Sequence, residues 1–247
     1  MSRPRFHCPG ELVSADVGNE YVLPDAVAHH ALRVLRLAVG DRVTLFTGTG
    51  GEFAATILRA DKRAAVAHIE AFDAVERENK LAVTLVQGIA ANDAMDHALR
   101  RSVELGATAI RPVLTTRSAR MPDGERGEKR LAHWRQIVIA ACEQCGRNRI
   151  PEVLSVIALE RWLGTRDPAG AGLVLAPDAD LAIAAAPPPG DALDLLVGPE
   201  GGFAPDEIAR AQRGGMTAVR LGPRVLRTET AALASLATIN ALWGDFR

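Results

Sequence analysis

The sequence predicts an α/β protein built from a small N-terminal β-barrel over residues 1–72 and a parallel sheet covered by helices over residues 81–247. In the first part, apolar and polar residues alternate in short runs, which is typical of an antiparallel meander. In the second part, short apolar runs alternate with stretches of helical periodicity, which is typical of β-α units. The chain has 247 residues, enough for two domains with separate cores.

The N-terminal part begins with a helical stretch, residues 25–37. Short turns separate the alternating runs that follow, which are residues 42–47, 52–58 and 64–70. A barrel this small is usually a binding module, and we expect it to bind RNA. The arginines that could face phosphate are Arg3, Arg5, Arg33 and Arg36.

A charged linker, residues 73–80, precedes the β-α pattern. The predicted strands are residues 81–87, 109–114, 172–176, 193–197 and 217–221. The predicted helices are residues 92–105, residues 130–145, a helix that begins at Pro205, and a last helix that begins at Thr228 or Thr230 and runs to about Trp243. Strands that alternate with helices in this way favour a parallel sheet with both faces covered.

The composition, 48% hydrophobic and 24% charged, is typical of a globular protein. No run of apolar residues is long enough to cross a membrane, and the N-terminus lacks the apolar stretch of a signal peptide. The sequence therefore predicts a cytoplasmic protein with no membrane partner.

The charge is unevenly distributed, although the net charge is only −1. Residues 100–149 hold eleven Arg and Lys against five acids, and residues 150–219 hold four against ten. A basic segment of this kind is expected in a protein that meets a polyanion on one face. The alternative is a coding bias of the source, because Arg outnumbers Lys 26 to 3.

The three cysteines cannot form a disulfide framework, although Cys142 and Cys145 make a C-x-x-C. This pair ends a helical pattern, where the helix dipole disfavours a thiolate. We therefore interpret both as ordinary small residues that are partly buried. The histidines show no ligand spacing with acids or cysteines, and no metal site is predicted.

Two glycine-bearing segments carry the chemistry of the second part. Residues 195–203 read Leu-Leu-Val-Gly-Pro-Glu-Gly-Gly-Phe, and residues 221–231 read Leu-Gly-Pro-Arg-Val-Leu-Arg-Thr-Glu-Thr-Ala. Each follows an apolar run and precedes a helical stretch, so each is predicted to be a loop at the carboxyl end of a strand, where open α/β sheets bind ligands. Neither has the glycine spacing of a dinucleotide site or a P-loop, and no G-x-S-x-G is present. The loops therefore indicate a ligand without a pyrophosphate.

These two segments together resemble the signature of the 16S ribosomal RNA uridine-N3 methyltransferases, a family of the SPOUT superfamily. The order of motifs is similar along nearly the whole chain, with further matches at residues 30–37, 104–112 and 141–147. The resemblance implies a C-terminal SPOUT-type α/β domain whose chain is tied into a trefoil knot, and a PUA-like N-terminal barrel. The chain departs from the family at Cys145 and Ala204, where serine is usual.

The resemblance further implies that the cofactor is S-adenosylmethionine, held in a bent shape by three loops at the knot. Backbone groups of glycine-rich loops suit the adenine edge, and leucines supply apolar walls. The implied cofactor residues are Leu175, Ala176, Pro177, Gly198, Pro199, Glu200, Gly201, Gly202, Leu221, Gly222, Leu226, Arg227 and Thr228.

The implied reaction is methyl transfer to N3 of one uridine in 16S ribosomal RNA, as naked RNA or in the small ribosomal subunit. N3 carries a proton, so the enzyme must supply a base, a cation for the developing charge, or both. Arg227 is the candidate cation, and Glu200 and Glu229 are the candidate bases. Either glutamate could instead have a structural role, Glu229 at a helix N-terminus and Glu200 within its loop.

Arg147 and Arg149 are the candidates to hold substrate phosphates. Members of this superfamily work as homodimers, and the last helix could pack at the interface or inside the chain. Two alternative functions stay open at this point. One is ribose 2′-O-methylation with the same cofactor, and the other is a non-catalytic RNA-binding factor of ribosome assembly that has kept the fold.

Overall fold

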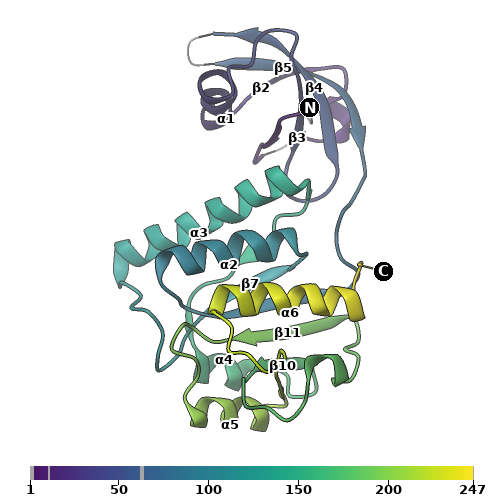
Figure 1. The fold of residues 1–247 in the computed structure, drawn as a ribbon. Coiled ribbons are helices and arrows are strands. Elements are labelled where there is room, and N and C mark those ends of the chain that lie inside the picture. Colours follow the sequence, from purple (N-terminus) through teal and green to yellow (C-terminus); the bar gives the residue numbers. More distant parts are fainter. Residues whose placement is uncertain (1–2, 11, 62–63, 247) are drawn as a thin grey trace. The chain divides into compact units, whose positions relative to one another are not determined.

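The computed structural model describes residues 3–10, 12–61 and 64–246 (Figure 1). The chain divides into two compact units. The first consists of the residues up to Glu78 together with Cys142–Ile150, and the second consists of Asn79–Ala141 and the residues from Pro151 onward. The sequence predicts a linear division with a linker at residues 73–80, and the structure differs from it because Cys142–Ile150 is part of the first unit.

The first unit contains a five-stranded sheet with the order β1-β3-β4-β5-β2. Strands β3, β4 and β5 pair antiparallel, which confirms the predicted meander. Strand β1 pairs parallel with β3, and β2 pairs antiparallel with β5. Both are too short to produce a periodic signal in the sequence. The bounds are Arg5–His7 for β1, Glu20–Val22 for β2, Arg42–Phe46 for β3, Glu52–Ala60 for β4 and Ala65–Asp73 for β5.

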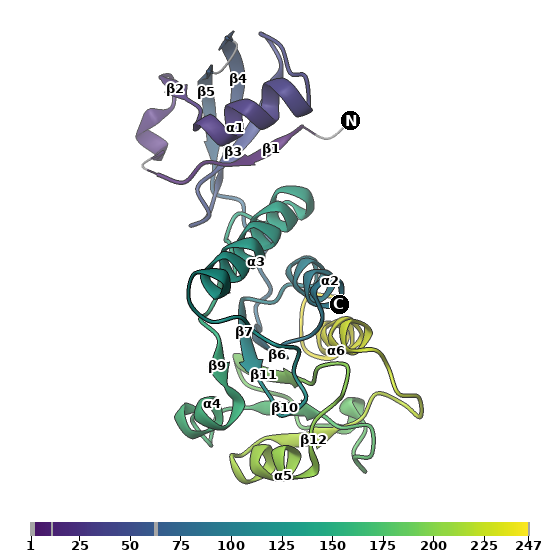
Figure 2. The same cartoon turned by 90° about the vertical axis from the view of Figure 1, so that its left-hand side faces the viewer.

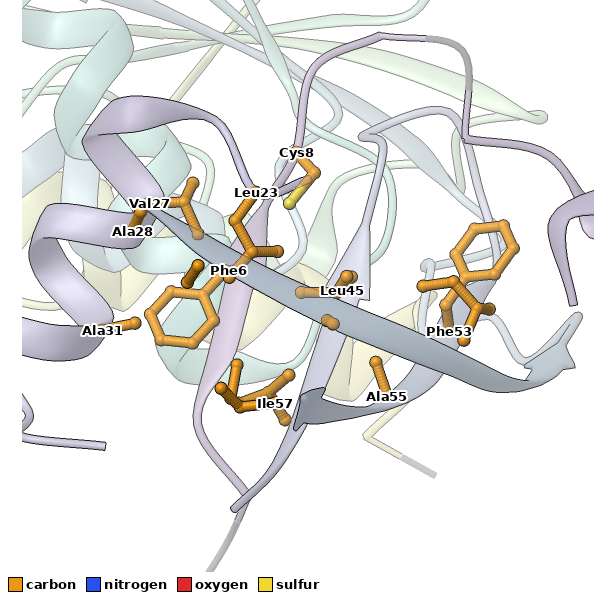
Figure 3. Close-up of a cluster of buried hydrophobic side chains, with 14 of the residues drawn as sticks. Phe6, Cys8, Leu23, Val27, Ala28, Ala31, Leu45, Phe53, Ala55 and Ile57 are labelled. Carbon is orange, nitrogen blue, oxygen red and sulfur yellow. The ribbon is translucent and has the colours of Figure 1, made fainter. Parts of the chain in front are cut away.

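The core of the first unit lies between this sheet and a helical segment. Along β4, Phe53, Ala55 and Ile57 are buried while the intervening residues are more exposed, as expected of a strand with one face inward. Figure 3 shows side chains of α1 (Asp25–His29) gathered with others from the strands of this core. A π-helical turn, η2 (His30–Val34), continues α1. The predicted helix to residue 37 ends earlier, because Arg36 has a φ of 57°.

The second unit contains a seven-stranded sheet with the order β12-β10-β11-β6-β7-β8, and β9 also pairs with β7. Every pairing is parallel, as predicted. The two-residue strands β8 and β9 were not predicted. The bounds are Ala82–Gly88 for β6, Ala109–Leu114 for β7, Glu152–Val153 for β8, Ile157–Ala158 for β9, Gly172–Leu175 for β10, Ala192–Val197 for β11 and Thr217–Val219 for β12.

Helices cover both faces of this sheet (Figures 1 and 2). Helices α2 (Asn92–Glu104) and α6 (Thr228–Leu242) lie side by side on one face. Helices α4 (Leu159–Thr165) and α5 (Pro205–Arg213) contact each other on the opposite face. Helix α3 (Gly124–Cys145) begins six residues before its predicted start, and the division between the units falls within it.

Successive side chains of a strand point to opposite faces of the sheet, so each face has its own hydrophobic core. Leu195 of β11 packs in the cluster that includes Leu236 of α6, and its neighbour Leu196 packs in the cluster that includes Trp162 of α4. The sheet is therefore apolar on both sides, as parallel sheets are. The trefoil knot implied by the resemblance stays a prediction. No helix within the described residues is long and apolar enough to span a membrane.

Candidate active site

The candidate site is a cavity of about 780 Å³ at the carboxyl ends of β10, β11 and β12. Three loops surround it, residues 176–182 after β10, residues 198–204 after β11 and residues 220–227 after β12. They meet because β10 pairs with both β11 and β12 in parallel, so all three strands end at one edge. Of the predicted cofactor residues, all but Arg227 line the cavity: Leu175, Ala176, Pro177, Gly198, Pro199, Glu200, Gly201, Gly202, Leu221, Gly222, Leu226 and Thr228.

Side-chain hydrogen bonds tie the three loops to one another. The guanidinium of Arg220 donates to the carbonyl oxygen of Ala179 at 2.8 Å and also to that of Asp180. The hydroxyl of Thr228 donates to the carbonyl oxygen of Gly198 at 2.5 Å. The 220–227 loop and the first residue of α6 thus hold the other two loops in place.

Residues that follow the strands β6 and β7 also form hydrogen bonds with the 198–204 loop. Glu200 Oε1 accepts a hydrogen bond from the backbone N–H of Ala91 at 2.8 Å. Arg117, which follows β7, donates to the carbonyl oxygens of Gly201 at 2.9 Å and Phe203 at 3.3 Å. The bond from Ala91 thus links Glu200 to the residues that follow β6 and holds its carboxylate at the cavity wall.

The glycines of the loops are needed for two different reasons. Gly202 has a φ of 67° and Gly222 a φ of 66°, and this left-handed conformation suits glycine. Gly201 is constrained by packing, because a Cβ there would lie 3.0 Å from Cβ of Arg117. A side chain at Gly201 would thus disturb the arginine that holds the loop.

The cavity suits a ligand that is partly apolar. Apolar side chains such as Leu175, Leu221 and Phe203 line it beside the exposed backbone of the glycine-rich loops. Charged side chains of both signs also line it, namely the acids Asp178, Asp180 and Glu200 and the arginines Arg117, Arg220 and Arg224. Its volume lies within the range of small-molecule sites, ~300–1,000 Å³. An apolar ring with polar edges fits this lining.

Comparisons with known proteins agree with this geometry. A family model described as an RNA methyltransferase domain matches residues 77–240, and one described as an RNA methyltransferase PUA domain matches residues 23–70. A ribosomal RNA small subunit methyltransferase E from Mycobacterium tuberculosis (strain CDC 1551 / Oshkosh) is 34% identical over 239 residues, which cover 92% of this chain and 88% of that protein. This chain belongs to the ribosomal RNA small subunit methyltransferase E family.

Solved structures extend the match to the whole fold. A ribosomal RNA small subunit methyltransferase E from Neisseria gonorrhoeae, solved bound to S-adenosyl methionine, has a TM-score of 0.92 and 40% identity, with 100% of each chain covered. A Legionella pneumophila protein, solved in complex with the cofactor SAM, has a TM-score of 0.94 and 35% identity over 100% of each chain. The predicted family, the α/β domain and the N-terminal PUA domain are thereby confirmed.

The three predicted catalytic residues are not placed alike in this member of the family. Glu200 lines the cavity, whereas Arg227 and Glu229 do not. Arg227 is the N-cap residue of α6 and is exposed, directly between two residues that line the cavity. Glu229 is partly buried in the first turn of α6. The catalytic roles of all three stay predictions.

Two of the arginines predicted to bind RNA are instead engaged within the first unit. The side chain of Arg5 is 13% exposed and donates to Glu52 at 2.6 Å and to Asn148 at 2.6 Å. The side chain of Arg147 is 5% exposed and is paired with Glu78. Because both guanidinium groups are buried against carboxylates, we correct these two assignments and interpret the residues as structural.

The other predicted RNA-binding arginines are on the surface. Arg3, Arg33 and Arg36 are exposed. Arg149 is also exposed, with its guanidinium 3.3 Å from a carboxylate oxygen of Glu76. These four stay candidates for phosphate contacts.

Several residues of the site lie outside the set predicted from the sequence. Arg117 and Arg220 lie outside the recognisable motifs, and their roles depend on how strands far apart in the chain are paired. The residues Asp178–Leu181 directly continue the predicted loop and also line the cavity. A predicted loop that extends from Leu175 to the next predicted strand or helix would include these residues among the cofactor candidates.

The C-x-x-C is not arranged as a redox pair. Burial raises the pKa of the Cys142 thiol to about 12, so this thiol is neutral at physiological pH. Cys142 is buried and Cys145 is partly buried, as predicted. No group of three or more His, Cys, Asp or Glu side chains in residues 3–10, 12–61 and 64–246 is arranged to hold a metal.

Proposed function

We propose that this protein methylates N3 of one uridine in 16S ribosomal RNA, with S-adenosylmethionine as the methyl donor. The single observation that carries the proposal is the cavity where the three loops meet, in a chain that belongs to the small subunit methyltransferase E family. S-adenosylmethionine supplies a methyl group on a positively charged sulfur, and it has no phosphate to be held.

The loops fit this donor in the chemistry of their lining. Backbone N–H and C=O groups of the 198–204 and 220–227 loops can bind the polar edge of adenine, while Leu175, Leu221 and Leu226 provide apolar walls. The carboxylates of Asp178 and Asp180 would attract the positive sulfur. Of the three arginines in the lining, Arg117 and Arg220 are bonded to backbone carbonyl oxygens.

Transfer to N3 of uracil requires that the N3 proton leave as the new N–C bond forms and the S–C bond breaks. We propose that Glu200 accepts this proton, because of the two candidate bases it is the one that lines the cavity. We assign the cationic role to Arg227, whose side chain is exposed beside the cavity. Its charge would stabilise the negative charge that develops on the uracil carbonyl oxygens.

The RNA and assembly assignments extend this proposal. The PUA domain would hold the RNA, with Arg3, Arg33, Arg36 and Arg149 facing phosphates. We further propose that the protein is a homodimer, that its C-terminal chain forms the trefoil knot, and that it acts in the cytoplasm on naked RNA or on the small ribosomal subunit.

Two measurements test the proposal. Titration calorimetry with S-adenosylmethionine is expected to show binding, and its absence would leave only the alternative of a non-catalytic assembly factor. Mass spectrometry of nucleosides from methylated RNA is expected to show 3-methyluridine. The appearance of 2′-O-methyluridine in its place would overturn the choice of nucleophile and keep the cofactor assignment.

A further inference from the structure

Gln87 is a buried amide at the point where the 198–204 loop begins and the 220–227 loop ends. It is the penultimate residue of β6 and is fully buried. It lies on the face of the sheet that carries Val83 and Leu85, because side chains alternate along a strand. This is the face covered by α6. In the neighbouring strand its partner is Val197, the last residue before the 198–204 loop.

The amide nitrogen of Gln87 bridges these two parts of the site. Nε2 donates to the carbonyl oxygen of Gly88 at 3.0 Å and to the hydroxyl oxygen of Thr228 at 3.0 Å, and the carbonyl oxygen of Gly198 is 3.4 Å away. The hydroxyl of Thr228 in turn donates to the carbonyl oxygen of Gly198 at 2.5 Å. Gln87 and Thr228 therefore form one connected network with the start of the 198–204 loop.

The carbonyl oxygen of the Gln87 side chain indicates that a contribution to stability does not by itself explain why a glutamine occupies this position. Gln87 Oε1 is buried and has no hydrogen-bond partner among the described residues. A buried acceptor without a partner destabilises the folded state. A methionine has similar length and carries no such acceptor, and the neighbouring strand residues are apolar. A residue that lowers stability in this way, where an apolar residue would fit, is expected at a functional site.

We propose that Gln87 is a positioning residue that, with Thr228, sets the spacing between the 198–204 loop and the N-terminus of α6. We call this pair the Gln87–Thr228 clasp. The clasp lies behind the cavity wall, since Thr228 and Gly198 line the cavity and Gln87 does not. The inference rests on the proposed function, because the affinity that the clasp sets is the affinity for S-adenosylmethionine.

The test compares single and double variants in the full-length protein. Gln87→Met removes the amide donors at nearly constant length, and Thr228→Val removes the hydroxyl at constant shape. Each is expected to raise the Kd for S-adenosylmethionine at least ~tenfold by calorimetry, because misplaced binding groups lose affinity steeply. The double variant is expected to lie within ~threefold of the weaker single variant, because members of one network are not additive.

Asn240→Leu is the matched control. Asn240 is another buried amide on α6. Its Nδ2 donates to the carbonyl oxygen of Leu105 at 2.8 Å and its Oδ1 accepts from Nδ2 of Asn79 at 2.6 Å, both outside the cavity lining. This variant is expected to lower the Tm and to leave the Kd within ~twofold of that of the unchanged protein, because the two bonds it removes lie outside the clasp. Thr228→Ser, which restores the hydroxyl, is expected to recover most of the affinity lost in Thr228→Val.

Four results would overturn the inference. A lower Tm with an unchanged Kd in Gln87→Met would make the amide merely structural. Effects that multiply in the double variant would mean that the two side chains act independently. If Gln87→Met does not fold, an unchanged Kd in Thr228→Val would overturn the inference in its place. An unchanged protein that binds no S-adenosylmethionine would overturn the proposed function, and the clasp with it.

Discussion

Arg227 is the residue on which the proposed chemistry depends most. Its side chain is exposed at the N-terminus of α6, and no hydrogen bond or ion pair of its guanidinium occurs within the part of the chain that the structure describes. A cation without a structural partner is available for a ligand or substrate. By contrast, Arg5 and Arg147 are bonded within the first unit.

Arg227→Ala is expected to lower kcat for RNA methylation by ~10²–10³-fold, the loss typical when a group that stabilises developing charge is removed. Its Tm is expected to stay unchanged, because the side chain is exposed. Steady-state kinetics and thermal melts check both statements, with the exposed Arg213→Ala as the control. Equal turnover in Arg227→Ala and the unchanged protein would remove this residue from the mechanism.

The cysteines give a second prediction for single residues. Burial raises the pKa of both the Cys8 and the Cys142 thiols to about 12. The thiolate is the form of cysteine that reacts with iodoacetamide. We therefore expect no labelling of Cys8 or Cys142 in the folded protein at neutral pH, and labelling of Cys145, which is only partly buried. Peptide mass spectrometry after a timed exposure measures this order. Labelling of Cys142 before Cys145 would contradict it.

Single residues were predictable where the chemistry is local. The glycines and leucines of the cavity were found because a motif of consecutive residues carries them. Arg117 and Gln87 were missed because their partners are far away in the sequence. Arg5 was assigned to RNA because its charge is visible in the sequence, whereas the burial of its guanidinium against Glu52 depends on the tertiary structure.

Helix α5 shows how an element can start without the usual cap. Its N-cap residue is Ala204, which has no side-chain acceptor. Glu207 compensates, because one carboxylate oxygen accepts from the backbone N–H of Ala204 at 2.8 Å and the other from the backbone N–H of Thr116 at 2.8 Å. The same carboxylate therefore starts the helix and anchors it to the segment after β7.

Ala204→Ser is expected to stabilise the protein by ~0.5–1 kcal/mol, because a serine hydroxyl can accept a hydrogen bond from the first turn of the helix. The backbone of Ala204 already has the extended conformation of an N-cap, with φ −72° and ψ 150°. Scanning calorimetry measures the change, with Ala204→Val as the control that adds bulk without an acceptor. A Tm that falls equally in both variants would show that the position has no room.

Most elements were predictable because their periodicity is strong. The antiparallel meander and the long strands β6, β7 and β11 are predicted to within three residues at each end. Strands β1, β2, β8 and β9 have two or three residues, too few to show any period. The end of the helical segment α1–η2 at Val34, before residue 37, is not predicted, because the left-handed conformation of Arg36 cannot be read from its residue type.

At the scale of the whole chain, Glu52 helps to join the segment Cys142–Ile150 to the rest of the first unit. It accepts hydrogen bonds from Arg5 and Arg77, and both arginines also donate to the carbonyl oxygen of Gly146. Burial alone would raise the pKa of Glu52, but the hydrogen bonds from Arg77 and Arg5 outweigh it and lower the pKa. A lowered pKa means that the folded state is stabilised by the ionised carboxylate.

The stabilisation by Glu52 is expected to be complete above the ordinary carboxyl pKa of ~4.3 and to be lost as the pH falls through the lower value in the folded state. Glu52→Gln should therefore reduce the free energy of unfolding by ~1–3 kcal/mol at pH 7, with a smaller difference near pH 3. Denaturant unfolding at both pH values checks this. Glu20→Gln is the control, since Glu20 forms an exposed ion pair with Arg59 in the same unit. A constant difference between pH 7 and pH 3 would contradict the assignment.

The central claim is that this chain uses its three-loop cavity to place a methyl group on N3 of one uridine of 16S ribosomal RNA. The most direct measurement is mass spectrometry of 16S ribosomal RNA from a strain that lacks this protein, complemented either with the unchanged chain or with Arg227→Ala. We predict one 3-methyluridine that is absent without the protein, restored by the unchanged chain and strongly reduced with Arg227→Ala. An unaltered set of methylated uridines in all three strains would contradict the account.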